Sequence, residues 1–380
     1  MNHPRSPRRI LLAVTGLTPQ VVTETLYALA CRAESPWIPH EVHLITTATG
    51  AENARLNLLL PDGWFHRLCR DYRLEGIAFP VENIHILCDT TGQPLEDIRT
   101  QEQNTLAADF ITDTLRKLTQ DPDSEVHVSI AGGRKTMGYY LGYALSLFGR
   151  PQDRLSHVLV SDPYETNRDF YYPTPYDLRI HSKRGDKEIS VDARNARVEL
   201  ADIPFVRLRD GLPERLSTGR AGFSRVVATA NRGLDDPRLV LNVAQRGAWA
   251  DDERLDLGDT EFTLLLWLAE RTRRGETTTD WSTLAMAEAF LGVAARVFNP
   301  MGGDYERIEK ALDWRKSAAL RTAKYFEPHK SRINKTLVET LGKRAAIRYA
   351  ITRVKEQETA QFFLPLAPEQ IEIIDATEIP

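Results

Sequence analysis

Ile10-Leu-Leu-Ala-Val-Thr-Gly-Leu-Thr-Pro-Gln-Val-Val-Thr-Glu-Thr-Leu26 is the stretch that decides the fold of the first half of the chain. It opens with an unbroken apolar run, residues 10–14, which is closed by a glycine turn. Thr18 and Pro19 then have the form of a helix N-cap followed by proline at the first helical position. Apolar residues recur after them at helical spacing. The stretch therefore predicts a strand, a turn and a helix, in that order.

The same alternation continues along the chain. We expect strands at residues 42–46, 84–87, 126–130 and 157–161, and helices at 51–60, 104–118 and 135–148. Apolar strands that alternate with amphipathic helices predict an α/β fold with a doubly wound, mostly parallel sheet covered on both faces. Short β-like runs at 170–172, 178–181, 188–191 and 197–200 are expected to add antiparallel strands at one edge. This first domain is predicted to span residues 1–209.

A connector at residues 210–237, rich in Gly, Arg, Asp and Pro, precedes a predicted second domain at 238–380. There we expect strands at 239–243 and 255–257, and helices from Asp259, at 281–291, at 304–325 and at 329–341. Pro328 is expected to separate the last two helices, and Gly342 to close the final one. Two β-like runs, 348–354 and 361–364, predict a hairpin. The layout is that of a mainly α, winged helix-turn-helix-like domain.

Composition limits the class of protein. The 380 residues are 42% hydrophobic and 27% charged, which suits a globular chain of about two domains. Three scattered cysteines indicate free thiols in a reducing compartment, so a cytoplasmic protein is expected. No apolar run reaches the roughly 18 residues of a membrane span. No cluster of His, Cys and carboxylates has metal-ligand spacing, so neither a metal nor another cofactor is predicted.

The loop at residues 14–20 is the first candidate site. A helix N-terminus presents free N–H groups and favours anions. Gly16 permits close approach of a ligand, and the Thr15 and Thr18 hydroxyls can donate to phosphate oxygens. Gln20 lies at the start of the helix. Capping of the helix by Thr18 is the alternative interpretation.

The loop at residues 129–136 is the stronger candidate. Gly132 and Gly133 permit backbone conformations that side chains would forbid. Arg134, Lys135 and Thr136 then place two cations and a hydroxyl at a helix N-terminus, where cations oppose the helix dipole unless an anion binds. The alternative is a glycine turn with solvated charges. The spacing is not that of a Walker loop.

Two further loops follow strands on the same edge, which is where open α/β sheets bind ligands. One contains Asp97, Arg99 and Thr100, and the other contains Tyr164, whose ring could stack on a base. The four loops together predict a phosphate-rich ligand, most simply a nucleotide.

Three segments carry a family resemblance: Leu11-Leu-Ala-Val-Thr-Gly-Leu-Thr-Pro-Gln-Val-Val-Thr-Glu-Thr-Leu26, Ser129-Ile-Ala-Gly-Gly-Arg-Lys-Thr-Met137 and Asp97-Ile-Arg-Thr100. They resemble the CRISPR-associated Rossmann-fold (CARF) family, and most closely its ring-nuclease-like branch, over about residues 8–209. The resemblance implies a homodimer that binds cyclic oligoadenylate, the messenger of type III CRISPR systems, across its two-fold axis. Ring nucleases of this kind linearise the messenger without a metal; cyclic tetra-adenylate is the expected ring.

By position, the resemblance assigns the pocket hydroxyl to Thr15 or Thr18 and the pocket lysine to Lys135. In the implied reaction a ribose 2′-hydroxyl attacks the neighbouring phosphorus and leaves a 2′,3′-cyclic phosphate. Lys135, Arg134 and the N–H groups of the glycines suit charge stabilisation, and Thr15 suits orientation. Thr15, Arg134 and Lys135 are thus the expected catalytic residues. The expected ligand contacts are Gly16, Thr18, Gln20, Asp97, Arg99, Thr100, Gly132, Gly133, Thr136 and Tyr164.

Two alternatives stay open. In one, the first domain only senses the ring, and the basic helix 329–341 with the hairpin to residue 364 binds DNA. Dimerisation or gating by that domain is the plainer interpretation, and Glu339, Glu356 and Glu358 would face phosphates unfavourably. In the other, an Arg150…His157 pair belongs to an effector ribonuclease, although the two residues flank a predicted strand.

Overall fold

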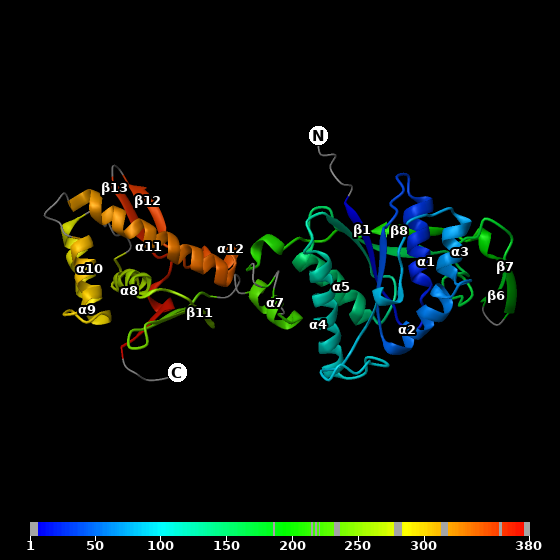
Figure 1. Ribbon diagram of the computed structural model, residues 1–380, viewed down its shortest axis with the longest axis horizontal. Coiled ribbons are helices and arrows are strands. Elements are labelled where there is room, and N and C mark those ends of the chain that lie inside the picture. The colour runs from blue at the N-terminus through cyan, green and yellow to red at the C-terminus, as the bar shows by residue number, and fades with distance from the viewer. Residues whose placement is uncertain are drawn as a thin grey trace. The chain divides into compact units, whose positions relative to one another are not determined.

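The computed structural model describes residues 7–375 except 185–186, 214–215, 217–218, 220, 232–235, 277–282, 313–317 and 357–358. The chain divides into two compact units (Figure 1). The first comprises Met1–Arg209 and Leu216–Val226, and the second comprises Asp210–Arg215 and Val227–Pro380.

A six-stranded sheet in the order β3-β2-β1-β4-β5-β8 forms the centre of the first unit. Its strands are β1 Arg8–Val14, β2 Glu41–Thr46, β3 Ile84–Ile86, β4 Ser124–Ser129, β5 Arg154–Val160 and β8 Val198–Asp202. The first five are parallel, and β8 runs antiparallel to β5. The predicted doubly wound, mostly parallel sheet is confirmed.

Helices cover both faces of this sheet (Figure 1). Leu11 and Ala13 of β1 pack toward α1, α2 and α3, whereas Ile10, Leu12 and Val14 pack toward α4 and α5. The period-two alternation of a strand thus supplies two separate apolar cores. The helices are α1 Gln20–Tyr27, α2 Ala48–Ala54, α3 Trp64–Asp71, α4 Gln101–Leu118 and α5 Lys135–Phe148, with π-helical turns η1 Ala28–Arg32 and η2 Arg55–Leu59.

Several helices start at other residues than the sequence predicted. Pro19, not Thr18, occupies the N-cap of α1, so the predicted Thr18 cap is wrong. The helix predicted at 51–60 begins at Ala48, because the Thr47 hydroxyl accepts a hydrogen bond from Gly50 N and caps it. The helix predicted at 104–118 begins at Gln101, and α5 starts and ends as predicted.

The edge of the sheet is simpler than predicted. Of the four β-like runs, only the last joins the sheet, as β8. β6 Arg179–Arg184 and β7 Lys187–Asp192 pair with each other in a separate hairpin. Residues 170–172 form no strand; their rings are buried in the core instead. Short 3-10 turns complete the unit at η3 Val81–Asn83 and η4 Ala193–Asn195.

Within the segment predicted as a connector, Ala221 and Phe223 contact α4. Arg116 is 2% exposed and donates to Ala221 O at 3.3 Å. Phe223 N donates to Asp109 Oδ1 at 2.6 Å at the start of α7 Phe223–Asn231. These bonds extend the first unit beyond the 3-10 turn η5 Arg209–Gly211.

The second unit is largely helical and contains a four-stranded sheet in the order β11-β10-β9-β14. Its strands are β9 Leu239–Asn242, β10 Gly247–Ala250, β11 Glu253–Leu255 and β14 Ile371–Ile374. β14 pairs in parallel with β9, and neither β10 nor β14 was predicted. The predicted hairpin is present as β12 Thr352–Glu356 and β13 Thr359–Phe363. The helices are α8 Asp259–Arg273, α9 Leu284–Val297, α10 Gly303–Ala311, α11 Ala318–Leu341 and α12 Lys343–Ala346, with the turn η8 Pro368–Gln370.

The prediction that Pro328 ends a helix is wrong, because α11 runs through it. A proline inside a helix costs about 3 kcal/mol. The same helix buries Phe326, Ile333, Leu337 and Leu341 to 1% exposure or less, and each such side chain contributes about 1.5–3 kcal/mol. Packing therefore outweighs the proline. The predicted helix 304–325 is in fact α10 and the start of α11, with residues 313–317 outside the described part, as is Trp281 of the predicted helix 281–291.

Candidate functional site

Three adjoining pockets lie where the parallel strands of the first unit end. The central pocket, about 510 Å³, is lined by Gly16, Thr18, Asp97, Arg134 and neighbours. The lysine pocket, about 670 Å³, shares Arg99, Gly133 and Arg134 with it and adds Thr100, Lys135 and Thr136. The amide pocket, about 410 Å³, shares Leu17 and Thr18 with the central pocket and adds Gln20, Asn53 and Asn57.

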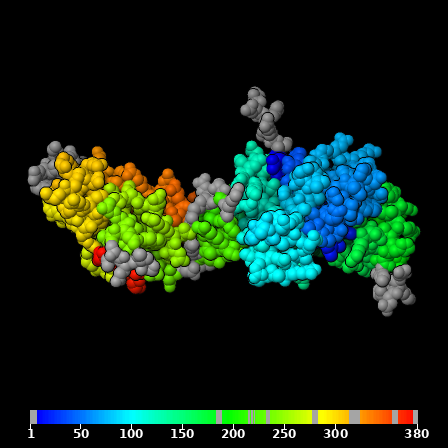
Figure 2. All heavy atoms as spheres, turned by 60° about the horizontal axis from the view of Figure 1, so that its bottom comes forward, coloured from blue at the N-terminus to red at the C-terminus, as the bar shows by residue number. Residues whose placement is uncertain are grey.

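The loop before α4 forms one wall of the central pocket by lying against the start of α2. Ala48 N donates to Leu95 O at 2.8 Å, and the Thr49 hydroxyl donates to Glu96 Oε2 at 2.6 Å. Figure 2 shows this cyan stretch beside the blue segments of the first unit on one face of the molecule. Two chain segments far apart in sequence are thus fixed at one edge of the sheet.

The two glycine loops contact each other directly. Gly133 has φ +78°, a conformation that favours glycine, and its Cα lies 3.6 Å from where a Cβ on Gly16 would stand. A Cβ at Gly132 would lie 2.7 Å from Val14 O and 2.9 Å from Val21 Cγ2. The predicted loops therefore meet because their glycines leave room for neighbouring backbone, and they bring the ends of β1 and β4 into one site.

Arg134 already has a partner. It is the N-cap of α5, and its guanidinium binds Asp97 through both oxygens, with Nε 2.7 Å from Oδ1 and a second contact to Oδ2. Arg99 Nε lies 3.1 Å from the same Oδ2. Hydrogen bonds from Arg134 and then Arg99 hold the pKa of Asp97 well below its usual range, against the opposing effect of desolvation. The repulsion expected between Arg134 and the helix dipole is thus relieved by Asp97.

The surroundings of Lys135 and Thr136 differ from those of Arg134. Both are exposed at the first turn of α5 and line the lysine pocket. Within the described parts of the chain, neither side chain has an ion-pair or hydrogen-bond partner. Lys135 is therefore an uncompensated cation beside free helix N–H groups, which is the arrangement that attracts a phosphate.

The expected orienting role of Thr15 does not fit the geometry. Thr15 is fully buried, and its hydroxyl donates to Thr46 Oγ1 at 3.4 Å between β1 and β2. Thr18 is exposed and lines both the central and the amide pockets. Of the two hydroxyls left open by the sequence, Thr18 is the one that a ligand can reach.

Two other predicted contacts have structural partners. Tyr164 is 6% exposed, and its hydroxyl donates to Asp192 O at 2.8 Å, so its ring is not available to stack on a base. Thr100 lines the lysine pocket but also caps α4 by accepting from Gln103 N at 3.2 Å. Gln20 lies in the amide pocket, 8% exposed.

Sequence reasoning missed Asn53 and Asn57. They lie four residues apart on the helical segment after β2 and face the same pocket as Gln20. Two asparagines at helical spacing after a strand were the available signal. The Arg150…His157 pair is not an active site: Arg150 is 8% exposed and bonded to Asp153 at 2.8 and 2.9 Å, while His157 lies on β5.

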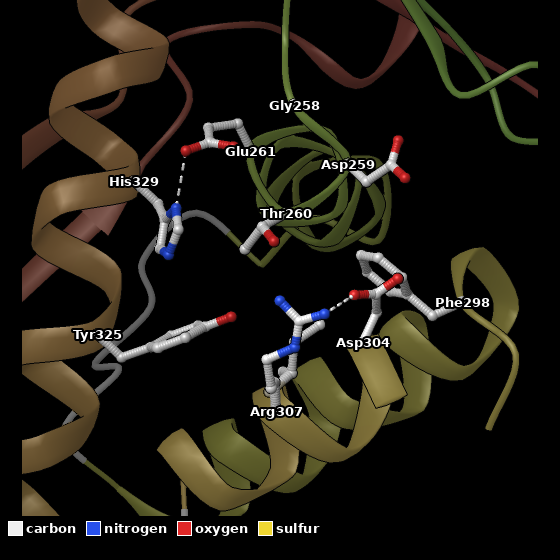
Figure 3. Close-up of a pocket in the computed structure, with 10 residues that line it drawn as sticks. Gly258, Asp259, Thr260, Glu261, Phe298, Asp304, Arg307, Tyr325 and His329 are labelled. Carbon is white, nitrogen blue, oxygen red and sulfur yellow. Dashed lines mark hydrogen bonds and ion pairs between the residues drawn. The ribbon is translucent and has the colours of Figure 1, made fainter. Parts of the chain in front are cut away.

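The second unit has its own pocket, about 450 Å³, at the start of α8 (Figure 3). Thr260, Tyr325 and Arg307 point into it from α8, α11 and α10. Glu261 Oε1 accepts from His329 Nδ1 at 2.8 Å and from Arg332 at 2.9 Å. Burial acts most strongly to raise the pKa of Glu261, but those two donors outweigh it and the pKa is lowered. His329 and Arg332 lie in the helix that one alternative assigned to DNA binding, whereas Thr260, Glu261, Arg307 and Tyr325 were not predicted as a site. This cavity is called the α8 pocket below.

Two kinds of site are absent from the described residues. No helix there is both long enough and apolar enough to cross a membrane. Nor do three or more His, Cys, Asp or Glu side chains gather there in a group that could hold a metal ion.

A family profile described as CRISPR-associated protein NE0113 matches residues 18–233, more than half of the chain. The chain belongs to this family. The match covers Thr18, Asp97 and the Arg134–Lys135 loop, and it ends before the α8 pocket of this NE0113-family protein. Family membership therefore concerns the first unit and its strand-edge pockets.

The solved structures similar to this NE0113-family protein have low sequence identity to it and low TM-scores. Can2 from Sulfobacillus thermosulfidooxidans, in complex with cyclic tetra-adenylate, is 12% identical with a TM-score of 0.24, over 93% of this chain and 74% of its own. Enterococcus italicus Csm6, bound to cyclic hexa-2′-fluoro-hexa-dAMP, is 13% identical with a TM-score of 0.26, over 94% of this chain and 73% of its own. No curated protein matches the chain.

Proposed function

We propose that the first unit binds cyclic oligoadenylate in its strand-edge pockets and linearises it. The observation that carries this proposal is Lys135, an exposed cation without a partner among the described residues, at the N-terminus of α5 and beside Gly133. Membership of a CRISPR-associated family and the resemblance of the two glycine loops to CARF proteins support the choice of ligand.

The proposed reaction is a transesterification within the ring. The 2′-hydroxyl loses its proton to solvent, a bond forms between O2′ and phosphorus, the bond from phosphorus to O5′ breaks, and O5′ takes a proton. The products are a 2′,3′-cyclic phosphate and a 5′-hydroxyl. Lys135 and the N–H groups at the start of α5 would stabilise the negative charge on the non-bridging oxygens, and the Thr18 hydroxyl would help to hold the phosphate in line.

The proposed ring-binding form of the protein is a homodimer. A ring of four identical nucleotides has a two-fold axis, so two copies of one cradle can contact opposite phosphates equally. Each protomer would supply its own Lys135 and Thr18. The second unit is then an appendage whose role is separate from the chemistry.

The test is incubation of the purified chain with cyclic tetra-adenylate and cyclic hexa-adenylate, in EDTA and in Mg²⁺, followed by chromatography of the products and a binding assay. Linear products that end in 2′,3′-cyclic phosphate, formed equally well in EDTA, are expected. Binding without cleavage would leave a sensor and reject the enzymatic part. No binding of either ring would reject the whole proposal.

DNA binding through residues 329–364 gains less support. A DNA-contacting helix needs cations that are free to reach phosphates. Several cations of α11 are already engaged: Lys330 lies 2.6 Å from Glu327, Arg332 2.9 Å from Glu261, and Lys335 3.5 Å from Glu339. We therefore favour the enzyme over the DNA-binding regulator.

A further inference from the structure

The proposed reaction begins when a ribose 2′-hydroxyl loses its proton. A neutral hydroxyl is a weak nucleophile, and a base within hydrogen-bond reach activates it. Lys135 and Arg134 are cations and offer no acceptor. The described residues that line the three strand-edge pockets include neither a histidine nor a cysteine. A side-chain base in these pockets is therefore a carboxylate.

Three carboxylates line these pockets: Glu96 and Asp97 in the central pocket, and Asp169 in the amide pocket. Asp97 binds Arg134 through both oxygens, and hydrogen bonds from Arg134 and then Arg99 hold its pKa well below its usual range. Such a carboxylate is a poor proton acceptor. Asp169 lies in a pocket that shares no lining residue with the lysine pocket. Glu96 is the carboxylate that remains.

Glu96 is held in place without being neutralised. Its Oε2 accepts a hydrogen bond from the Thr49 hydroxyl at 2.6 Å. The preceding residue, Leu95, is 7% exposed, and its main chain donates to Leu87 O and accepts from Ala48 N, both at 2.8 Å. Among the residues that the structure describes, no cation pairs with the Glu96 carboxylate. The main chain and one oxygen are thus fixed, and the second oxygen is left to accept a proton.

The central pocket places this carboxylate next to the groups assigned to the phosphate. Glu96 lines it together with Thr18 and Gly133. Gly133 and Arg134 also line the lysine pocket, so a nucleotide whose phosphate lies beside Lys135 can extend its ribose into the central pocket. The attacking 2′-oxygen belongs to the ribose that carries this phosphate on O3′. A base in one pocket and a cation in the next can therefore act on one nucleotide.

We propose that Glu96 is the general base of ring cleavage. The inference rests on the proposed function and adds the group that holds the proton before solvent takes it. The proton of O2′ passes to the free oxygen of Glu96 as the bond from O2′ to phosphorus forms. The bond from phosphorus to O5′ breaks, and O5′ takes a proton from solvent. Glu96 then releases its own proton to solvent, so no further reactant is needed.

The test is Glu96→Gln in the full-length chain. Glutamine keeps the size of the side chain and an oxygen for the Thr49 hydroxyl, but it cannot take up the proton. Single-turnover cleavage of cyclic tetra-adenylate is measured between pH 6 and pH 8 in EDTA. The rate at pH 7 is expected to fall by about 10²-fold.

The slope of the rate against pH shows where the proton goes. In Glu96→Gln hydroxide must take it, so the rate should rise roughly tenfold per pH unit, whereas the wild-type rate should vary much less. The other charged side chains of the central pocket, Asp97, Arg99 and Arg134, keep one charge state over this range. They therefore leave the slope unchanged.

Ring affinity separates a base from a residue that only shapes the pocket. Glu96→Gln removes a negative charge that repels the ring, so titration should show an affinity that is unchanged or up to roughly 3-fold higher. A fall in affinity together with an unchanged pH slope would mean that Glu96 binds the ring or holds the loop, and would overturn the assignment.

The matched control is Glu52→Gln. Glu52 is an exposed carboxylate of α2 that pairs with Arg55 at 2.9 Å and lines none of the three pockets, so its variant should keep the wild-type rate and slope. If Glu96→Gln also kept both, the general base would be rejected while the proposed function stands. If the wild type left the ring intact, the proposed cleavage would fail, and the general base with it.

Discussion

The strand-edge pockets of the first unit and the α8 pocket of the second are similar in size but opposite in how their polar groups are satisfied. In the α8 pocket each charged side chain has a partner: Asp259 with Arg246, Asp304 with Arg307 at 2.6 Å, and Glu261 with His329 and Arg332. At the strand edge, Lys135 and the Gln20 oxygen have none within the described ranges.

The difference teaches that volume alone does not mark a ligand site. Glu261 of α8 joins two residues of α11, so the charges of the α8 pocket hold helices together. The strand-edge pockets keep a cation, Lys135, and the lining residue Gln20 keeps a buried amide oxygen, and neither group has a partner in the described chain. Unsatisfied groups lower stability unless a ligand completes them. The site with the poorer internal bonding is therefore the better candidate for function.

The largest expected effect is on the stability of the first unit, and it concerns the buried carboxyl group of Glu24. Glu24 of α1 is 6% exposed, and desolvation, then repulsion by Glu165, raises its pKa to about 8. Its folded-state pKa lies above the unfolded value, so its contribution to stability is fully present below about pH 4.5 and is lost as pH rises through about 8. Glu24→Gln, which cannot ionise, is expected to be more stable than the wild type at pH 9 by on the order of 4 kcal/mol.

Chemical denaturation of the full chain at pH 5 and pH 9 measures this difference. The two proteins should be nearly equally stable at pH 5. Glu52→Gln is the control, because Glu52 is exposed and pairs with Arg55 at 2.9 Å. A variant no more stable than the wild type at pH 9 would show that the pKa of Glu24 is not raised in the folded state.

Lys135→Ala is expected to lower the rate of ring cleavage by about 10²–10³-fold. The lost ammonium is the group assigned to the charge that develops on phosphorus, so the rate should fall more than ring affinity does. Lys117→Ala is the control, since Lys117 is also exposed and helical but pairs with Asp113 at 2.6 Å. Single-turnover cleavage and a separate titration distinguish rate from affinity. Unchanged turnover in Lys135→Ala would remove its catalytic role.

Much of the first unit was predictable from local pattern. Parallel strands buried on both faces produce the apolar runs that mark β1, β2 and β4, and α5 shows its full length in its spacing. The glycine loops were predictable for the same reason, since they follow strands directly. Tertiary pairing was not predictable. Strand β14 pairs with β9 across more than 130 residues, Ile371 opposite Leu239, and no local signal announces that partner.

The site was predictable in its residue types rather than in its details. Which threonine of the first loop faces a ligand depends on the register of β1 against β2, where Val14 pairs with Ile45 and Thr15 is buried beside Thr46. The Arg134–Asp97 pair joins residues 37 apart, so the charge of Arg134 is balanced by a partner that spacing could not indicate. The position of Lys135 depends on no such partner: Lys135 is exposed at the first turn of α5, where the sequence predicts it.

Glu261→Gln should affect the second unit in the opposite pH direction from Glu24→Gln. The pKa of Glu261 is lowered in the folded state, so its stabilisation is present above the unfolded pKa and is lost as pH falls through the folded one. The variant is expected to be less stable than the wild type at pH 7 by about 1 kcal/mol and nearly equal to it at low pH. Glu339→Gln, at an exposed pair, is the control for denaturation. If Glu261→Gln slowed ring cleavage, the α8 pocket would not be independent of the strand-edge pockets.

The smallest expected effect concerns Asp97, whose carboxylate forms ion pairs with Arg134 and Arg99 at the strand-edge site. Asp97→Asn removes the carboxylate that engages Arg134 and Arg99, so it frees cations and removes a negative charge from the wall of the central pocket. Ring affinity should rise by roughly 3–10-fold, most clearly at low salt, because the released charges interact with phosphate through solvent. Asp62→Asn, at an exposed pair with Arg70 outside the pockets, is the matched control. Titration at two salt concentrations decides between two roles for Asp97. Tighter binding would mean that Asp97 restrains Arg134 until a ligand arrives, whereas weaker binding would mean that the Asp97–Arg134 pair holds the loop in its binding shape.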